Sequence, residues 1–323
     1  MNISVLGCGR WGSFLAWYIA KVGHSATLWG RTNSLALQNL RDTRQNSYLR
    51  LPDNVRITDS LDEATDTAQI LIISISAQQL RGFCRQLNSQ RIIGKSLLLC
   101  MKGLEIDTGK RLTEVVHEEL GDEVQVGIWV GPGHVQDFLR DVPNCMVIDS
   151  CNPMLTQRMA EAFASHLIRF YYGTDLIGNE VGAAAKNVIG LAAGMLDGLG
   201  LSSLKGALMA RGAREVSRLI HAMGGSELTA YGLGHLGDYE ATLFSPHSHN
   251  RAFGEAFVQG QQFGCLAEGV PTTAALFKLA KYYGVDMPVN KAVYQSITGE
   301  RNPREALEIL FLRPLKTEFL SGY

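Results

Sequence analysis

The sequence predicts an α/β fold, in which a doubly wound, mostly parallel sheet is followed by an all-helical C-terminal domain. Up to about residue 178, short apolar runs alternate with helical patterns, and after Gly178 the strand signals stop. Apolar strands that alternate with helices are typical of a parallel sheet covered on both faces. The two predicted domains therefore span residues 1–178 and 179–323.

Seven runs rich in apolar residues are predicted to be strands, at residues 3–7, 25–30, 69–76, 96–103, 124–131, 145–149 and 167–172. Helical patterns separate most of these strands, for example at residues 12–22 and 155–166. The second domain is predicted to contain helices at residues 179–197, 202–223, 251–261, 271–283, 289–297 and 303–312.

The composition is that of a globular protein, with 46% hydrophobic residues, 19% charged residues and a formal net charge of -1. A charge this close to zero gives no support for a nucleic acid or a membrane surface as partner. No apolar run is long enough to span a bilayer and the chain starts with a predicted strand, so we expect neither membrane insertion nor a signal peptide. Six scattered cysteines without a C-x-x-C pair are typical of free thiols, and predict a cytoplasmic location.

The first predicted strand leads directly into GCGRWG (residues 7–12), a G-x-G-x-x-G motif that opens a predicted helix. In this motif the first glycine allows a tight turn, the second lets backbone approach a pyrophosphate, and the third lets the helix pack on the strand. The start of the helix adds free N–H groups and a partial positive charge. The alternatives are a glycine turn without a ligand and, for the tryptophan, a packing role. We expect a Rossmann-like dinucleotide site built from Gly7, Gly9, Arg10, Trp11 and Gly12.

Cofactor selectivity is normally set at the end of the second strand, where a carboxylate accepts hydrogen bonds from the adenosine ribose and repels a 2′-phosphate. In this chain the strand ends LWGR (residues 28–31) and carries no carboxylate. The guanidinium of Arg31 suits a phosphate group. The cofactor is therefore expected to be NADP or NAD, with NADPH favoured, and the alternative is a solvated arginine at a strand end.

Lys186 stands alone in the small and apolar run GAAAKNVIGLAAGM. On a helix, Gly182, Lys186, Gly190 and Gly194 share one face, because residues four apart are neighbours. Glycine in a helix interior costs about 1 kcal/mol relative to alanine, so something must approach this backbone closely. One interpretation is a substrate and a nicotinamide pressed against bare backbone. The other is a tight helix crossing with a lysine that reaches past it to water.

Several segments together resemble the NAD(P)-dependent glycerol-3-phosphate dehydrogenase family. They cover nearly the whole chain: GCGRWGS (7–13), LWGR (28–31), MKGLE (101–105), GPGHV (131–135), KNVIGLAAGMLDGLG (186–200), ALMARGAREVSRL (207–219), GLGHLGD (232–238), SHNRAFG (248–254) and EGVPT (268–272). The resemblance implies reduction of dihydroxyacetone phosphate to sn-glycerol 3-phosphate, which supplies glycerophospholipid synthesis. It also implies a Rossmann domain that carries the nucleotide and a helical domain that closes over the substrate.

The resemblance also assigns roles to individual residues. It implies that Lys186 is the catalytic lysine, with Lys102 and Asp238 beside it. The implied substrate contacts are Lys102, Gly131, Lys186, Asp238, Thr242, Ser248, His249, Asn250 and Arg251. The implied cofactor contacts beyond the glycine loop and Arg31 are Lys102, Val135, His249 and Glu268.

The chain departs from the family pattern at three places. Gly133 stands where many members have a serine or threonine, His249 replaces an arginine, and Tyr239 follows Asp238 where a leucine is usual. These changes leave open a related reductase of another small 2- or 3-hydroxy acid or phosphorylated carbonyl. A dinucleotide-binding sensor without catalysis is a further alternative, and a homodimer is compatible with the sequence.

The chemistry of carbonyl reduction gives these residues a physical role. Apolar surroundings should lower the pKa of Lys186 towards working pH, Lys102 should act in the same direction, and Asp238 should oppose the shift. Asn250 and the N–H groups that open the helix at 251–261 are expected to hold a phosphate, with Arg251 and protonated His249 adding charge.

Each of these residues also has a simpler interpretation. Lys102 could be a surface lysine, Asp238 a cap, and Asn250 and Arg251 a helix cap with its first-turn partner. The histidines near Asp238 do not form a closed ligand set, so no metal is expected.

Overall fold

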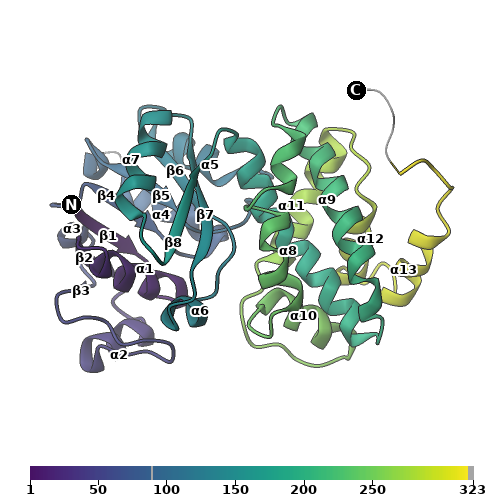
Figure 1. The fold of residues 1–323 in the computed structure, drawn as a ribbon, viewed down its shortest axis with the longest axis horizontal. Helices are drawn as coiled ribbons and strands as arrows, with labels where there is room; N and C mark the ends of the chain where they lie inside the picture. The colour runs from purple at the N-terminus through teal and green to yellow at the C-terminus, as the bar shows by residue number, and fades with distance from the viewer. Residues whose placement is uncertain (89, 319–323) are drawn as a thin grey trace.

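The computed structural model describes residues 1–88 and 90–318, and places a sheet domain beside a helical domain (Figure 1). The last five residues of the predicted second domain, 319–323, lie outside the described residues. The predicted division at residue 178 falls within the first turn of α8 (Leu176–Gly198), the helix that leads from one half into the other.

The sheet has eight strands in the order β3-β2-β1-β4-β5-β6-β7-β8. All neighbouring strands are parallel except β6 and β7, which are antiparallel, so the predicted mostly parallel sheet is confirmed. The strands are β1 (Asn2–Leu6), β2 (Ser25–Trp29), β3 (Arg56–Thr58), β4 (Ile70–Ile73), β5 (Ser96–Leu99), β6 (Gln125–Val130), β7 (Asn144–Ser150) and β8 (Ile168–Tyr172). The sequence prediction missed β3, because a three-residue edge strand with one isoleucine has no apolar run.

Seven helices accompany the strands: α1 (Arg10–Lys21), α2 (Leu35–Thr43), α3 (Leu61–Thr65), α4 (Leu80–Leu87), α5 (Leu112–Leu120), α6 (Val135–Leu139) and α7 (Pro153–Phe163). Local chemistry sets the starts of three of them, since the side chains of Ser34, Ser60 and Asn152 accept hydrogen bonds from the first-turn N–H groups of α2, α3 and α7. The strand order reverses between β1 and β4. A parallel sheet binds ligands in the crevice at such a reversal, beyond the carboxyl ends of the strands.

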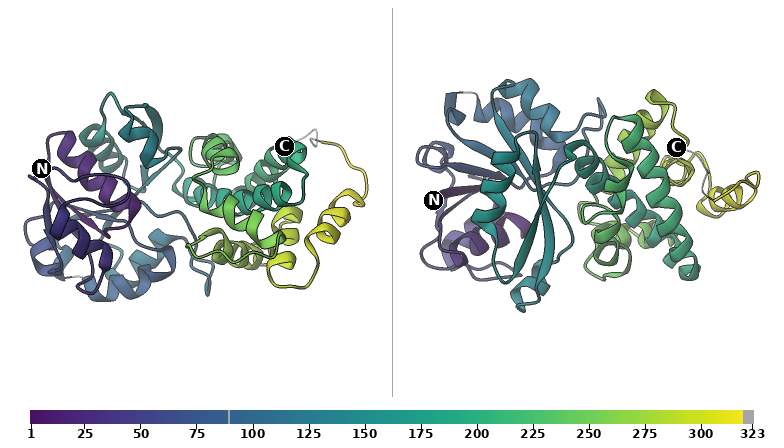
Figure 2. Two further views of the ribbon diagram at one scale, coloured as in Figure 1. Left: turned by 90° about the horizontal axis from the view of Figure 1, so that it is seen from below. Right: turned by 45° about the horizontal axis from the view of Figure 1, so that its top comes forward.

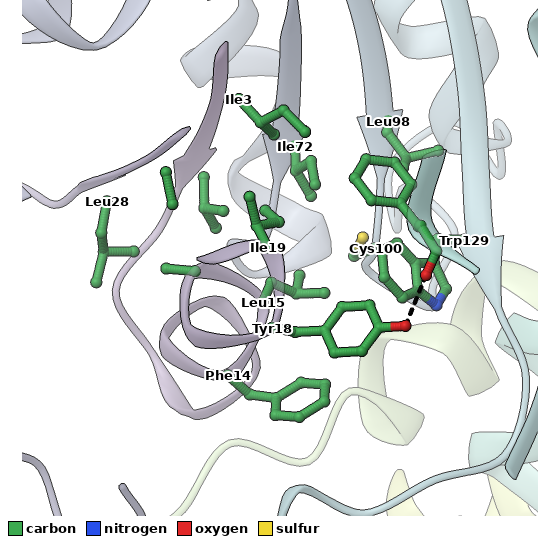
Figure 3. Packing of buried hydrophobic residues seen from close by; sticks show 14 of the residues in the cluster. Ile3, Phe14, Leu15, Tyr18, Ile19, Leu28, Ile72, Leu98, Cys100 and Trp129 are labelled. Carbon is green, nitrogen blue, oxygen red and sulfur yellow. Dashed lines mark hydrogen bonds between the residues drawn. The ribbon is translucent and has the colours of Figure 1, made fainter. Parts of the chain in front are cut away.

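The apolar face of α1 packs on the sheet (Figure 3). Phe14, Leu15, Tyr18 and Ile19 are fully buried there with strand residues such as Trp129. The phenol of Tyr18 donates a hydrogen bond of 2.6 Å to the carbonyl of Phe163. This packing fixes the start of α1, and therefore the glycine loop, against the sheet.

The second domain is helical, as the sequence predicts (Figure 2), and its helices pack around α8. Its other long helices are α9 (Lys205–Ala222), α10 (His249–Val258), α11 (Gly269–Tyr282), α12 (Pro288–Ile297) and α13 (Pro303–Phe311). Helix α8 contacts α9, α10, α11 and α12 as well as β6 and β7. Its residues are therefore buried along almost the whole length of the helix. Within residues 1–88 and 90–318, no helix has the length and apolar character needed to cross a membrane.

Candidate active site

A cleft of about 1020 Å³ lies at the carboxyl ends of the strands and reaches the helical domain. It brings together segments that follow β1, β2, β4 and β5 with side chains from α8, from residues 238–250 and from Glu268. Predicted site residues that line it are Gly7, Gly9, Arg10, Trp11, Arg31, Lys102, Val135, Lys186, Asp238, Thr242, Ser248, His249, Asn250 and Glu268. Gly12, Gly131 and Arg251 are not part of its lining.

The glycine loop has the form that a dinucleotide requires. A Cβ on Gly9 would meet nothing within 4 Å, so this backbone is open to the cleft, whereas a Cβ on Gly12 would collide with the carbonyl of Gly7. Gly9 N-caps α1 without a side chain, which leaves the first N–H groups of the helix for an anion. The second glycine therefore admits a pyrophosphate, and the third permits close packing of helix and strand.

The residues around this loop divide between the cleft and the core. Trp11 lines the cleft, and its ring also packs against that of Phe14, with 5.0 Å between the ring centroids. The tryptophan therefore contributes both to the cleft wall and to the core. Arg31 is exposed at the edge of the cleft. It follows Gly30, where a Cβ would lie 2.5 Å from the Sγ of Cys8. An exposed guanidinium at this position can approach a group bound beyond β2.

Lys186 lies at the floor of the cleft and is only 8% exposed. Its Nζ is 2.9 Å from Oδ2 of Asp238 and donates a 2.8 Å hydrogen bond to Oγ1 of Thr242. Burial is the largest influence and lowers the pKa of Lys186 to about 8; Asp238 acts to raise the pKa and Lys102 to lower it. These are the directions that the apolar surroundings predict. The amine can therefore exchange a proton near neutral pH.

Lys102 shares the same carboxylate oxygen. Its Nζ lies 2.7 Å from Oδ2 of Asp238 and donates a second hydrogen bond of 2.7 Å to the carbonyl of Gly131. Gly131 has a φ of +134°, and a Cβ there would lie 2.9 Å from the Cα of Met146. Gly131 therefore acts through its backbone: it orients Lys102 rather than lining the cleft.

Two asparagines connect the lysines to the helical domain. The amide of Asn250 donates to Oδ1 of Asn187 at 3.0 Å, and the amide of Asn187 donates to the carbonyl of Lys102 at 3.1 Å. Oδ1 of Asn250 accepts from the N–H of Gly269 at 2.9 Å. Asn250 thus holds α10, α8 and α11 together beside the cleft.

Arg251 does not point into the cleft, contrary to the expectation that it adds charge for a phosphate. Its guanidinium lies 2.9 Å from Asp197 and 2.9 Å from Glu255. Helix α10 starts two residues earlier than predicted, and Ser248 is its N-cap, accepting from the N–H of Arg251. An arginine in the first turn of this helix is directed towards the acidic groups behind it.

His249 faces the cleft, but its surroundings disfavour the protonated form that would add charge there. Burial lowers the pKa of His249, and nearby Arg10 acts in the same direction. Burial likewise lowers the pKa of His134, whose Nε2 lies 2.8 Å from the carbonyl of Ala241. In the part of the chain that the structure describes, no group of three or more His, Cys, Asp or Glu side chains could hold a metal ion.

The glycines of α8 make room for other parts of the same chain rather than for a substrate and a nicotinamide. A Cβ on Gly182 would lie 3.0 Å from the Cβ of His235, and one on Gly190 would lie 2.8 Å from Thr242. A Cβ on Gly194 would collide with the backbone of Arg251. The close approach is therefore made by residues 235–251 of the same chain, and the tight-crossing interpretation is correct for Gly194.

Glu268 shows an unsatisfied polar atom in the cleft. Its Oε1 accepts a 3.1 Å hydrogen bond from the N–H of Ala77, which follows β4, but its Oε2 is buried without a partner among the described residues. Burial raises the pKa of Glu268. Since a buried unpaired oxygen is costly, this atom is suited to accept a hydrogen bond from a bound molecule.

Several parts of the site were not identified from the sequence. Among them are Asn187, His134 and the residues Ser74, Ile75, Ser76, Gln78 and Gln79, which also line the cleft. Asn187 carried a usable signal, because it is a polar residue next to Lys186 in an apolar helix. The departure at Gly133 is also explained, since a Cβ there would collide with the ring of Phe138.

Comparison with known proteins shows the family of the chain. Family models described as the NAD-dependent glycerol-3-phosphate dehydrogenase N-terminus and C-terminus match residues 2–156 and 175–308. The glycerol-3-phosphate dehydrogenase (NAD(P)+) of Pelodictyon phaeoclathratiforme is 35% identical over 98% of this chain and 99% of its own length. That of Fusobacterium nucleatum is 35% identical over 99% of both chains.

A solved structure shows the same architecture. The crystal structure of glycerol-3-phosphate dehydrogenase from Coxiella burnetii has a TM-score of 0.89 and 26% identity, and the match covers 97% of this chain and 99% of that one. The fold therefore agrees with the sequence matches. The chain therefore belongs to the family of NAD(P)-dependent glycerol-3-phosphate dehydrogenases, which are oxidoreductases.

Proposed function

We propose that the chain reduces dihydroxyacetone phosphate to sn-glycerol 3-phosphate with NADPH or NADH, with Lys186 as proton donor, and so supplies glycerophospholipid synthesis. The observation that carries the proposal is a buried ammonium in the dinucleotide cleft, held by Asp238 at 2.9 Å and by Thr242 at 2.8 Å. When bound, the reduced nicotinamide supplies the hydride. The chain itself supplies placement and the proton.

Lys186 is suited to general acid and base catalysis because its pKa of about 8 lies near working pH. In the reduction the charged amine donates a proton to the carbonyl oxygen, and in the oxidation the neutral amine accepts the hydroxyl proton. Asp238 and Thr242 direct the amine, and the ammonium of Lys102 can polarise the same oxygen. Burial of the group strengthens these charge interactions, because water is excluded.

The substrate phosphate is proposed to bind at the start of α10. Asn250 and His249 line the cleft there, and the helix N-terminus offers N–H groups to an anion. Binding energy from this remote group can orient the carbonyl for attack. Arg251 would act indirectly, because its ion pairs with Asp197 and Glu255 anchor the first turn.

The direct test is oxidation of NADPH and NADH in the presence of dihydroxyacetone phosphate. We expect turnover with at least one of the two cofactors, and no turnover with either would overturn the proposal. A related reductase of another small hydroxy acid or phosphorylated carbonyl is the second candidate, because His249 and Gly133 alter the residues around the substrate. A panel of phosphorylated and carboxylated carbonyl compounds separates the two.

The rate of reduction should depend on pH in a defined direction. The pKa of Lys186 is lowered to about 8, and the reduction needs the charged amine. Consequently kcat/KM for reduction should be constant below the pKa and fall about tenfold per pH unit above it. The oxidation needs the neutral amine, and its rate should rise through the same pH range. Initial rates in both directions across this range test the assignment, and parallel profiles would contradict it.

Arg31 should determine cofactor preference. The exposed guanidinium at the end of β2 is placed to bind a 2′-phosphate, so Arg31→Asp should weaken NADPH binding by about tenfold or more while changing NADH binding much less. Fluorescence titration with both cofactors measures this. Arg158→Asp, which changes the same charge at an exposed position on α7, is the control. Equal losses for both cofactors would refute this role of Arg31.

A cytoplasmic location and a homodimer remain part of the proposal. The six cysteines are free, which is compatible with a reducing compartment. Phe311, Leu312 and Leu315 are exposed apolar side chains near the end of the described chain, and a partner subunit would cover them. Light scattering on the purified protein tests the dimer.

A further inference from the structure

A buried pair of side chains lies behind Lys186 and is not used by the chemistry described above. His235 and Tyr239 are both 0% exposed. Nδ1 of His235 lies 2.8 Å from the carbonyl of Gly182, and the phenol oxygen of Tyr239 lies 2.7 Å from Nε2 of the same ring. Because a carbonyl only accepts, Nδ1 must carry the hydrogen, and in the neutral ring Nε2 accepts from the phenol.

Both groups keep these protonation states at neutral pH. Burial lowers the pKa of His235 to about 4 and raises the pKa of Tyr239. The charged groups that influence the pKa of His235 are Lys186, which lowers it, and Asp238, which raises it. Glu215 and Tyr231 both raise the pKa of Tyr239. The pair therefore forms a fixed chain of two hydrogen bonds from Tyr239 to the backbone of α8.

The two side chains that form these hydrogen bonds lie on either side of Asp238 in the sequence. His235 precedes the short turn Leu236–Asp238, and Tyr239 follows Asp238 directly. At the other end, Gly182 lies one helical turn before Lys186 on α8. A Cβ on Gly182 would be 3.0 Å from the Cβ of His235, so the ring lies against bare backbone. The segment with the carboxylate is thus attached to the helix with the amine, one turn from the amine itself.

We propose that His235 and Tyr239 are positioning residues for the reaction, which hold the Asp238 carboxylate at its short distance from the Lys186 ammonium. The inference rests on the proposed role of Lys186 as proton donor. Without the phenol, Nε2 of His235 is buried and unpaired, a state that the protein relieves by moving the turn. A carboxylate that has moved away supports the charged amine less, and Lys186 then loses its proton at a lower pH.

The variant Tyr239→Phe tests this directly through the pH profile of kcat/KM for reduction. We expect its alkaline limb to move to lower pH by about half a unit or more relative to the unsubstituted enzyme. A purely structural role would lower thermal stability and leave the limb in place. Tyr18→Phe is the matched control, because Tyr18 is a fully buried phenol in the sheet domain that donates to the carbonyl of Phe163. Its limb should not move.

The variant His235→Asn provides an independent test. The amide nitrogen of asparagine can replace Nδ1 and donate to the carbonyl of Gly182. The shorter side chain then places no acceptor at the position of Nε2, which Tyr239 contacts, so the limb should move as in Tyr239→Phe. The double variant should show no larger shift than either single variant, because both single variants remove the same hydrogen bond between Tyr239 and His235. An unmoved limb in whichever variant folds overturns the inference. An unsubstituted enzyme without an alkaline limb would instead overturn the role of Lys186.

Discussion

Replacement of Lys186 by alanine should lower kcat for reduction of dihydroxyacetone phosphate by about 10²–10⁴-fold, the range that a general acid contributes. The buried ammonium is placed on the cleft floor between Asp238 and Thr242, and alanine removes the proton donor without touching the glycine loop. Affinity for NADPH should therefore change little. Steady-state kinetics and fluorescence titration of the cofactor measure the two quantities separately.

The control for this variant is Lys95→Ala. Lys95 is a half-buried lysine that binds the carbonyls of Asp66 and Ala68 just before β5, at the end of the strand opposite the cleft. Its loss should reduce stability slightly and leave kcat unchanged. If Lys186→Ala retained its turnover, the catalytic assignment would fail, and a sensor that only binds the dinucleotide would become the better interpretation. Loss of cofactor binding would show that the variant had disturbed the cleft.

Asp238→Asn should have the second large effect, on both activity and stability. Oδ2 of Asp238 contacts the ammonium groups of Lys186 and Lys102 at 2.9 and 2.7 Å, and the residue is 1% exposed. Breaking a buried pair by removing one partner costs about 3–5 kcal/mol, and here two cations lose one anion. Because Asp238 raises the pKa of Lys186, the amine should become neutral at lower pH and the reduction should slow.

Calorimetry and the pH profile of kcat/KM measure these effects. Asp149→Asn is the comparison, since Asp149 is a fully buried carboxylate on β7 that accepts from the amide of Asn179 at 2.7 Å and lies in the sheet domain. That change should alter the free energy of unfolding without moving the pH profile. An Asp238→Asn enzyme with an unchanged profile would show that the carboxylate does not influence Lys186.

Most of the architecture could be predicted because its signals are local. Buried strands are short apolar runs, and seven of the eight were found in this way. The glycine loop and Lys186 were identified because each places an unusual residue type in a recognisable helix or turn. Strand β3 escaped because its pairing with β2, rather than its own composition, makes it a strand.

The directions in which side chains point could not be predicted from such local signals. Arg251 was expected to face a phosphate, but its guanidinium is bound by Asp197, 54 residues earlier in the chain. The glycines of α8 were compatible with a bound substrate or with a helix crossing, and only the position of residues 235–251 decided between them. His249 was expected to add charge when protonated, and its burial and the nearby Arg10 disfavour the protonated form.

By itself the sequence determined seven of the eight strands, the helices of the second domain, the dinucleotide loop and the identity of the lone lysine, because each depends on neighbours a few residues away. The tertiary structure decided which polar groups meet: that Lys102 and Lys186 share one oxygen of Asp238, and that His235 and Tyr239 fasten this segment to α8. Such contacts join residues far apart in the chain. They depend on packing geometry and on the cost of leaving buried polar atoms unpaired, which no local pattern of residues records.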